Sequence, residues 1–219
     1  MKILFCPAHY AHLNNRGSEV EWAYRITKSL AEQNNNSVVV TGFTNIKSSL
    51  YNIVELQPTK SQINLGLINT IYFALSYGIY AVKILRQKTF DIHHHVLPFS
   101  LGRSFNLAFI FPRKNVKRII GPIQKPIPAY ADNLHDPLQR LSRVQLLKNT
   151  LLNAFVAVFA LPLNVLSSLT LRRADVLVAI NDDVKEALIK KGCEAQKIIV
   201  IPPGLNTSTF TRNGEQRCV

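Results

Sequence analysis

The chain has 219 residues, of which 47% are hydrophobic and 18% are charged, proportions that exclude an intrinsically disordered protein. Its length suits one well-buried domain or two small ones. The formal net charge is +13, and the region from Lys83 to Arg173 accounts for +11 of it, with fourteen Lys or Arg and three acids. Such a region favours anionic partners: the phosphates of a lipid-linked substrate, an acidic membrane surface or nucleic acid. The alternative is a solvated basic surface that only aids solubility.

Short β-branched runs alternate along the chain with longer helical patterns, which is typical of a parallel sheet covered by helices. In chain order, we expect strands at Lys2–Cys6, Ser37–Phe43, Asn52–Leu56, Phe90–His95, Lys117–Gly121, Asp175–Ile180 and Lys197–Ile201. We expect helices at Gly17–Gln33, Leu65–Gln87, about Ser100–Phe109, about Pro137–Arg172 with a break at Pro162, and Asp183–Lys191. The predicted fold class is α/β, with a Rossmann-like, mostly parallel sheet of about seven strands and helices on both faces.

Residues at the predicted helix ends support this assignment. Ser18 can cap the first helix, and the asparagines that follow Gln33 end it. Asn181 or Asp182 can cap the last helix, which ends at two lysines and Gly192. The polar residues after Gly204 have no apolar period and indicate a linker or a tail, so we expect a domain over residues 1–205 and a linker or disordered tail over 206–219.

Two apolar stretches resemble membrane spans without matching them. Ile63 to Leu85 contains two asparagines and a lysine, and Leu151 to Leu171 contains two asparagines and a proline. A span needs about 20 largely uninterrupted apolar residues, so we interpret both stretches as buried or interfacial helices.

Cys6, Cys193 and Cys218 form no CxxC pair, which disfavours a disulfide framework or a zinc site and suits a reducing compartment. We therefore expect a cytoplasmic protein, with peripheral contact with the inner face of a membrane as an option.

The loop that follows the first predicted strand carries His9 and His12 and ends in Gly17-Ser18-Glu19 at a helix start. In an open α/β sheet, ligands bind beyond the carboxyl ends of the strands, and a helix N-terminus presents free N–H groups to an anion. An ordinary capped turn explains so short a motif equally well.

The fourth predicted strand ends in His93-His94-His95. Because side chains alternate along a strand, His93 and His95 share one face and His94 points to the other. We expect one or two of these rings to face a cleft and to contact a hydroxyl or a phosphate. No Asp, Glu or Cys accompanies them at metal-ligand spacing, so we expect no metal. Nothing in the sequence requires a cofactor.

Six segments in this order resemble the N-terminal domain of the retaining glycosyltransferases of the GT-B fold, often called group 1 or family 4. They are Gly17-Ser18-Glu19, Val38-Val39-Val40-Thr41, Phe90-Asp91-Ile92-His93-His94, Gly121-Pro122, Ala174-Asp175-Val176-Leu177-Val178-Ala179, and Val200-Ile201-Pro202-Pro203-Gly204-Leu205-Asn206. The resemblance runs from Met1 to about Phe210. It implies one half of a GT-B fold, the half that binds the acceptor, facing a second domain that holds a nucleotide sugar.

The resemblance also implies roles for individual residues. Gly17, with Ser18, corresponds to the glycine-rich turn near the donor phosphate, although Arg16 stands where many members have a second glycine. His94 corresponds to a histidine at the reaction centre, with His95 as the alternative register. Gly121 and Pro122 correspond to a turn on the acceptor side. We add four candidate contacts by position: Lys125 and Arg103 for an acceptor phosphate, and His9 and His12 for the acceptor.

Family members hold the donor with a basic residue and paired glutamates of a second domain, and we expect nothing after Phe210 to supply either. We therefore expect the acceptor-binding half of a hexosyltransferase for a glycan or lipid-linked acceptor, inactive without a donor-binding half. A non-catalytic remnant or binding module with the same fold is the alternative. Nucleic-acid binding rests on basicity alone, so we expect no nucleic-acid partner. An oxidoreductase is disfavoured because no GxGxxG follows the first strand.

Overall fold

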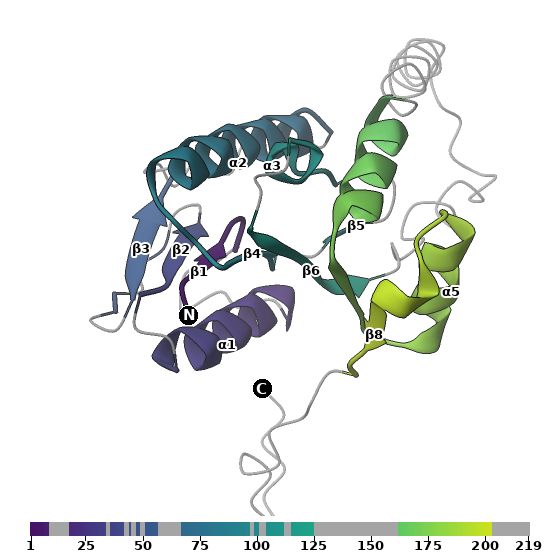
Figure 1. Cartoon of the computed structure of the whole chain (residues 1–219), viewed down its shortest axis with the longest axis horizontal. Helices are drawn as coiled ribbons and strands as arrows, with labels where there is room; N and C mark the ends of the chain where they lie inside the picture. The colour runs from purple at the N-terminus through teal and green to yellow at the C-terminus, as the bar shows by residue number, and fades with distance from the viewer. Residues whose placement is uncertain are drawn as a thin grey trace, which may run out of the picture.

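A computed structural model describes residues 1–8, 18–33, 36–41, 44, 47–48, 51–56, 67–96, 99–100, 104–111, 115–124 and 162–202. These residues form one parallel sheet with helices on both faces (Figure 1). In chain order, the strands are β1 (Ile3–Phe5), β2 (Val38–Thr41), β3 (Asn52–Glu55), β4 (Ile92–His95), β5 (Phe99–Ser100), β6 (Lys117–Gln124), β7 (Val176–Ala179) and β8 (Ile198–Val200). The helices are α1 (Ser18–Glu32), α2 (Leu67–Gln87), α3 (Leu107–Ile110), a helix over residues 162–173, and α5 (Asp182–Lys190), followed by a 3₁₀ turn at Ala195–Lys197.

The strand order is β3-β2-β1-β4-β6-β7-β8, and β5 pairs with β6 beside this path. All of the pairings are parallel. The chain therefore runs outward from β1 to β3, returns across the sheet and continues outward from β4 to β8, which is the order of a Rossmann-like domain. The predicted fold class is confirmed.

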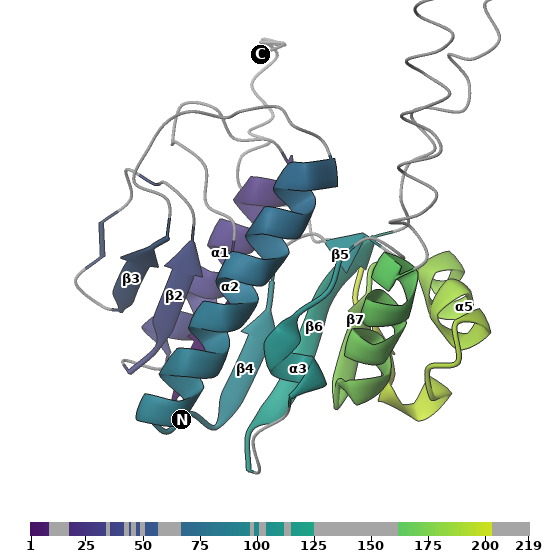
Figure 2. The ribbon, with the colours of Figure 1, turned by 90° about the horizontal axis from the view of Figure 1, so that it is seen from above.

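The helices fall on two sides of the sheet. Phe5 and Val39 pack toward α1, and Leu4 and Val40 on the same strands pack toward α2. The face that carries Leu4 continues through Leu177, and α3, the helix over 162–173 and α5 lie on it (Figure 2). In the described part of the chain, α1 is the helix on the opposite face.

The sequence anticipates most element bounds to within a few residues. Asn181 caps α5, since its Oδ1 accepts a hydrogen bond from the Val184 N–H at 2.9 Å. The helix expected at about Ser100–Phe109 is wrong in its first part: β5 occupies Phe99–Ser100, and Asn106 caps a single turn, α3. Residues 137–161 of the long predicted helix lie outside the described residues, and its last part is the helix that starts at 162.

None of the helices in these described ranges is long and apolar enough to cross a bilayer. Cys6 and Cys193 are buried free thiols, and Cys218 lies outside the described residues.

Candidate functional site

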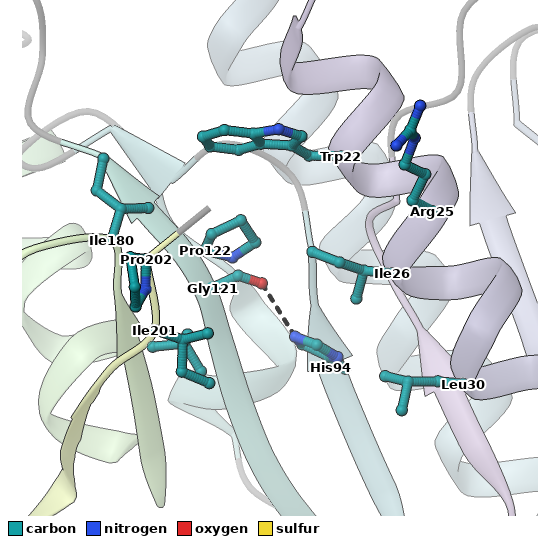
Figure 3. A pocket seen from close by; sticks show the side chains of 11 residues that line it. Trp22, Arg25, Ile26, Leu30, His94, Gly121, Pro122, Ile180, Ile201 and Pro202 are labelled. Carbon is teal, nitrogen blue, oxygen red and sulfur yellow. Dashed lines mark hydrogen bonds between the residues drawn. The ribbon is translucent and has the colours of Figure 1, made fainter. Parts of the chain in front are cut away.

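A cavity of about 350 Å³ lies on the α1 face of the sheet, between α1 and the part of the sheet formed by β6 and β7 (Figure 3). Residues from α1, from three strands and from the segments that follow β7 and β8 line it: Trp22, Arg25, Ile26, Leu30, His94, Gly121, Pro122, Val178, Ile180, Ile201 and Pro202. Most of these side chains are apolar. The polar groups at the cavity are therefore few, and they come chiefly from Arg25, His94 and the Gly121 carbonyl.

His94 faces this cavity because it pairs with Phe5, whose side chain points toward α1. The His94 Nε2 lies 3.0 Å from the Gly121 carbonyl oxygen. A carbonyl can only accept, so Nε2 carries the proton and, in the neutral ring, Nδ1 keeps a lone pair. Burial lowers the pKa of His94 to about 4, although the hydrogen bond to Gly121 favours the charged form. At neutral pH the ring is an uncharged hydrogen-bond acceptor at Nδ1.

The backbone conformation and the close packing at position 121 of β6 require a glycine. Its φ is +145°, and a Cβ there would lie 2.6 Å from the Val178 Cβ and 2.7 Å from the Val178 carbonyl oxygen. The pairing of β6 with β7 shifts register between Ile120 and Ile123, and the Gly121-Pro122 peptide is cis. An irregular turn of β6 thus brings a carbonyl to His94 and a proline ring to the cavity wall.

Trp22, Ile26 and Leu30 recur at helical spacing and place one face of α1 against the cavity. Sequence reasoning missed this contribution, although the i, i+4, i+8 spacing and the single tryptophan of the chain were visible. Arg25 stands at the rim, half exposed, with its Nε donating to Glu21 Oε1 at 2.8 Å. The cavity therefore offers an aromatic ring and a guanidinium beside a neutral imidazole.

His93 and His95 lie on the other face of the sheet and do not line this cavity. His93 Nε2 donates to the Cys6 carbonyl at 2.7 Å, and its ring packs against Phe109. His95 Nδ1 accepts from the Asn106 amide at 3.3 Å. Burial lowers the pKa of His93 to about 4 and that of His95 to about 3, in His95 with help from the neighbouring imidazoles.

Asn106 joins these groups into one network. Its amide nitrogen also donates to the Cys6 carbonyl at 3.1 Å, and its Oδ1 accepts from the Ala108 N–H at 3.0 Å. The network links β1, β4 and α3 inside the core, away from the cavity. It pairs the His93 Nε2, the His95 Nδ1 and the Asn106 side chain at full burial, while the buried His93 Nδ1 has no hydrogen-bond partner among the described residues.

The sequence-predicted site residues are thus only partly brought together. His94, Gly121 and Pro122 meet at the cavity, and His95 lies across the sheet. Ser18 is the first residue of α1, the helix that forms one cavity wall. The other candidates lie outside the described residues: Gly17, Lys125, Arg103, His9 and His12. Within the ranges described above, no three His, Cys, Asp or Glu side chains are placed to hold a metal ion.

An all-parallel sheet in this strand order, with a cavity beside the first helix, defines a Rossmann-like domain. The family model of Glycosyltransferase Family 4 matches residues 20–209, and the chain belongs to this family. The family identified by its sequence motifs is confirmed.

Among solved structures, the chain is similar to one described as the lipopolysaccharide outer core galactosyltransferase WaaB in its apo form. The two are 11% identical with a TM-score of 0.46, and the match covers 94% of this chain and 46% of that one. The chain thus spans about half the length of this structural neighbour. A comparison with curated proteins finds no match.

Proposed function

We propose that residues 1–205 are the acceptor-binding half of a nucleotide-sugar-dependent hexosyltransferase. One observation carries this proposal: three of the residues that the family resemblance singles out, His94 on β4 and Gly121 and Pro122 on β6, line one cavity with α1. The cavity lies on the α1 face of the sheet. Among the described helices, α1 is the one that covers this face, so the cavity is open beside it. Such a position suits a substrate held between this domain and a second one.

The cavity residues have complementary tasks in this proposal. The neutral His94 ring accepts a hydrogen bond from a sugar hydroxyl through Nδ1, while Gly121 holds its other nitrogen. Trp22 offers an apolar ring face to the sugar, and Arg25 attracts a phosphate or hydroxyl of the acceptor. Lys125, Arg103 and His9 stay proposed contacts of the acceptor.

The donor diphosphate would approach the start of α1, at Gly17 and Ser18, where a helix N-terminus favours negative charge. The basic residue and paired glutamates that grip the donor would belong to a donor-binding domain, carried by a continuation of this chain or by a second polypeptide. Residues 206–219 would form the start of a linker to it. Because stabilising the leaving diphosphate is the main catalytic demand, residues 1–205 alone would be inactive.

The proposal includes contact with an anionic membrane surface. The acceptor would be a glycan or a lipid-linked precursor of a polysaccharide, and a lipid-linked acceptor is reached at such a surface. The net charge of +13 supports this contact. The site would then work on the cytoplasmic face of the inner membrane.

Coexpression of the chain with a family 4 donor-binding half tests the proposal. We expect hexose transfer from one of a panel of UDP- and GDP-sugars, and no transfer by either half alone. His94→Gln retains an amide donor for the Gly121 carbonyl and loses the imidazole acceptor, so kcat should fall at least about 100-fold with little change in Tm. Transfer by the donor half alone, or full activity of His94→Gln, would overturn the assignment. The absence of transfer with every donor would favour the non-catalytic alternative.

A further inference from the structure

Two helices on the face of the sheet opposite the cavity expose apolar side chains to solvent. On α2, Leu75 and Ile79 are exposed, with Ile79 at 61%. On the helix over 162–173, Val165 and Leu169 are exposed at the same i, i+4 spacing. Water-facing helix surfaces are normally polar, so two helices on one face of the sheet with the same exception form a feature that needs a partner.

Each exposed apolar pair is followed by cations on the same helix stripe. Lys83 and Arg86 follow Ile79 by four and seven residues, and Arg172 and Arg173 follow Leu169 by three and four. All four side chains are exposed, but the Arg172 guanidinium turns to the end of α5, where its Nη2 donates to the Lys191 carbonyl oxygen at 3.4 Å. Neither helix contains an acidic residue. The two helices therefore present an apolar centre with a purely cationic end.

The helix α3 lies between them and joins them into one surface (Figure 2). Gly78 of α2 faces Leu107 so closely that a Cβ would lie 2.9 Å from the Leu107 Cβ. On the other side, the Asn106 N–H donates to Thr170 Oγ1 at 3.1 Å. Phe111, which directly follows α3, is 69% exposed. The docking face, defined as Leu75, Ile79, Phe111, Val165 and Leu169 with the cations Lys83, Arg86 and Arg173, is thus held together by packing.

The neighbouring helix α5 shows what an ordinary solvated helix of this protein looks like. It carries Asp182, Asp183 and Glu186 among its exposed residues and alternates them with lysines. Its one exposed large apolar residue is Ile189, at 42%. The acid-free composition is therefore a property of the two helices and not of the whole face.

We propose that the docking face binds the surface of an anionic phospholipid bilayer. Apolar side chains would enter the headgroup boundary, and Lys and Arg would extend their stems along it to reach lipid phosphates. A second copy of this chain would bring cations to cations, so charge favours the lipid. This inference rests on the membrane contact in the proposed function and names the surface that makes it.

Sedimentation with vesicles tests the inference on the full chain. Binding to vesicles of phosphatidylcholine and phosphatidylglycerol should exceed binding to pure phosphatidylcholine at least tenfold, and should weaken with salt. Ile79→Glu should weaken binding to the anionic vesicles at least tenfold. Ile189→Glu is the matched control, the same change on α5, and should alter it less than twofold. Equal effects of the two variants, or equal binding to both vesicle types, would overturn the inference.

Cation removal gives an independent readout. Lys83→Ala and Arg86→Ala should each weaken binding about fivefold, since a cation near such a surface contributes about 1 kcal/mol. Lys185→Ala and Lys190→Ala on α5 are the controls and should change it little. A dimer that Ile79→Glu converts to a monomer, with vesicle binding retained, would assign the face to a second copy and reject the lipid. Transfer to a soluble acceptor by the coexpressed halves should be unchanged in Ile79→Glu, so the docking face and the transfer reaction fail separately.

Discussion

The two halves of the sheet are covered differently. Strands β1 and β2 lie between α1 and α2, and Val38, Val39 and Val40 are buried on both faces. Strands β7 and β8 are packed on one face against α5 and the helix over 162–173, while Ile199 on the other face is 49% exposed. His94 and Gly121 lie at the boundary between these halves. The closed half thus supplies stability, and the open half leaves room for a ligand or a second domain.

Lowering the pH should have the largest effect on the free energy of unfolding, because it protonates the three histidines of β4 at this boundary. The pKa values of His93, His94 and His95 are lowered by burial to about 4, 4 and 3, while the unfolded value is about 6.5. Below about pH 6.5 the unfolded chain binds protons that the folded chain does not, so stability falls as the pH falls toward 4. Three such sites give up to about 4 kcal/mol per pH unit.

Urea denaturation at pH 7, 6 and 5 measures this slope. Of the three rings, His94 is the one that faces the cavity. His94→Gln should therefore reduce the slope by about a third, and His93 and His95 on the opposite face should account for the remaining slope. Equal stability at pH 7 and pH 5 would contradict the prediction.

Gly121→Ala should have the next largest effect, because it forces the two halves apart at β6 and β7. The new Cβ would meet the Val178 backbone, which cannot move aside, and the φ of +145° is strained for any side chain. We expect a loss of more than about 3 kcal/mol in the free energy of unfolding, or no soluble protein. Gly192→Ala is the control: its φ is +81°, but the atom nearest to the new Cβ is the end of the flexible Arg172 side chain. It should lose about 1–2 kcal/mol.

Leu177→Ala and Ile199→Ala compare the two faces of the open half directly. Leu177 is fully buried against α5 and the helix over 162–173, so its truncation should cost about 2–5 kcal/mol. Ile199 belongs to the uncovered face, and its truncation should cost less than about 1 kcal/mol. Thermal or urea unfolding gives both values. Similar losses for the two variants would show that something covers the open face of the free chain.

The closed half is also the part that the sequence describes best. Val38-Val39-Val40 indicates a strand buried on both faces, and the alternation of β and α patterns predicts the parallel sheet. The two-residue strand β5 and the single turn of α3 are too short to give a periodic pattern, so the sequence predicted one longer helix there. Their structure depends on pairing with β6 and on the Asn106 cap, which are tertiary contacts.

The candidate site is predictable where it depends on alternation along a strand. That rule placed His94 on one face and His93 with His95 on the other, as the structure has them. It could not choose which face is open, because that depends on where the helices cross the sheet. For the same reason Trp22 and Arg25 were not recognised: their spacing shows a helix face but not what lies opposite it.

A small effect on stability is expected from Asp175→Asn, which tests how the strands of the open half are held at their start. Asp175 directly precedes β7, and its carboxylate accepts three hydrogen bonds from Arg118 on β6. The donors are the Arg118 backbone N–H at 2.7 Å, Nε at 3.0 Å and Nη2 at 2.8 Å. Burial raises the pKa of Asp175, but the hydrogen bonds and charge of Arg118 outweigh it, so the net pKa is lowered. We expect a loss of about 1 kcal/mol at pH 7, because the partly exposed carboxylate is screened by solvent.

The pKa of an Asp side chain in the unfolded chain is about 3.9, and that of Asp175 in the folded protein is lower. Asp175 therefore stabilises the folded protein at any pH above about 3.9, and this stabilisation is lost only as the pH falls through the folded pKa. The difference between the wild type and Asp175→Asn should therefore stay constant from pH 8 to pH 6 and shrink in high salt. Asp183→Asn, at the exposed start of α5, is the control and should cost less. A difference that disappears already between pH 8 and pH 6 would mean that the histidines of β4, and not the Arg118–Asp175 pair, set the stability of this edge.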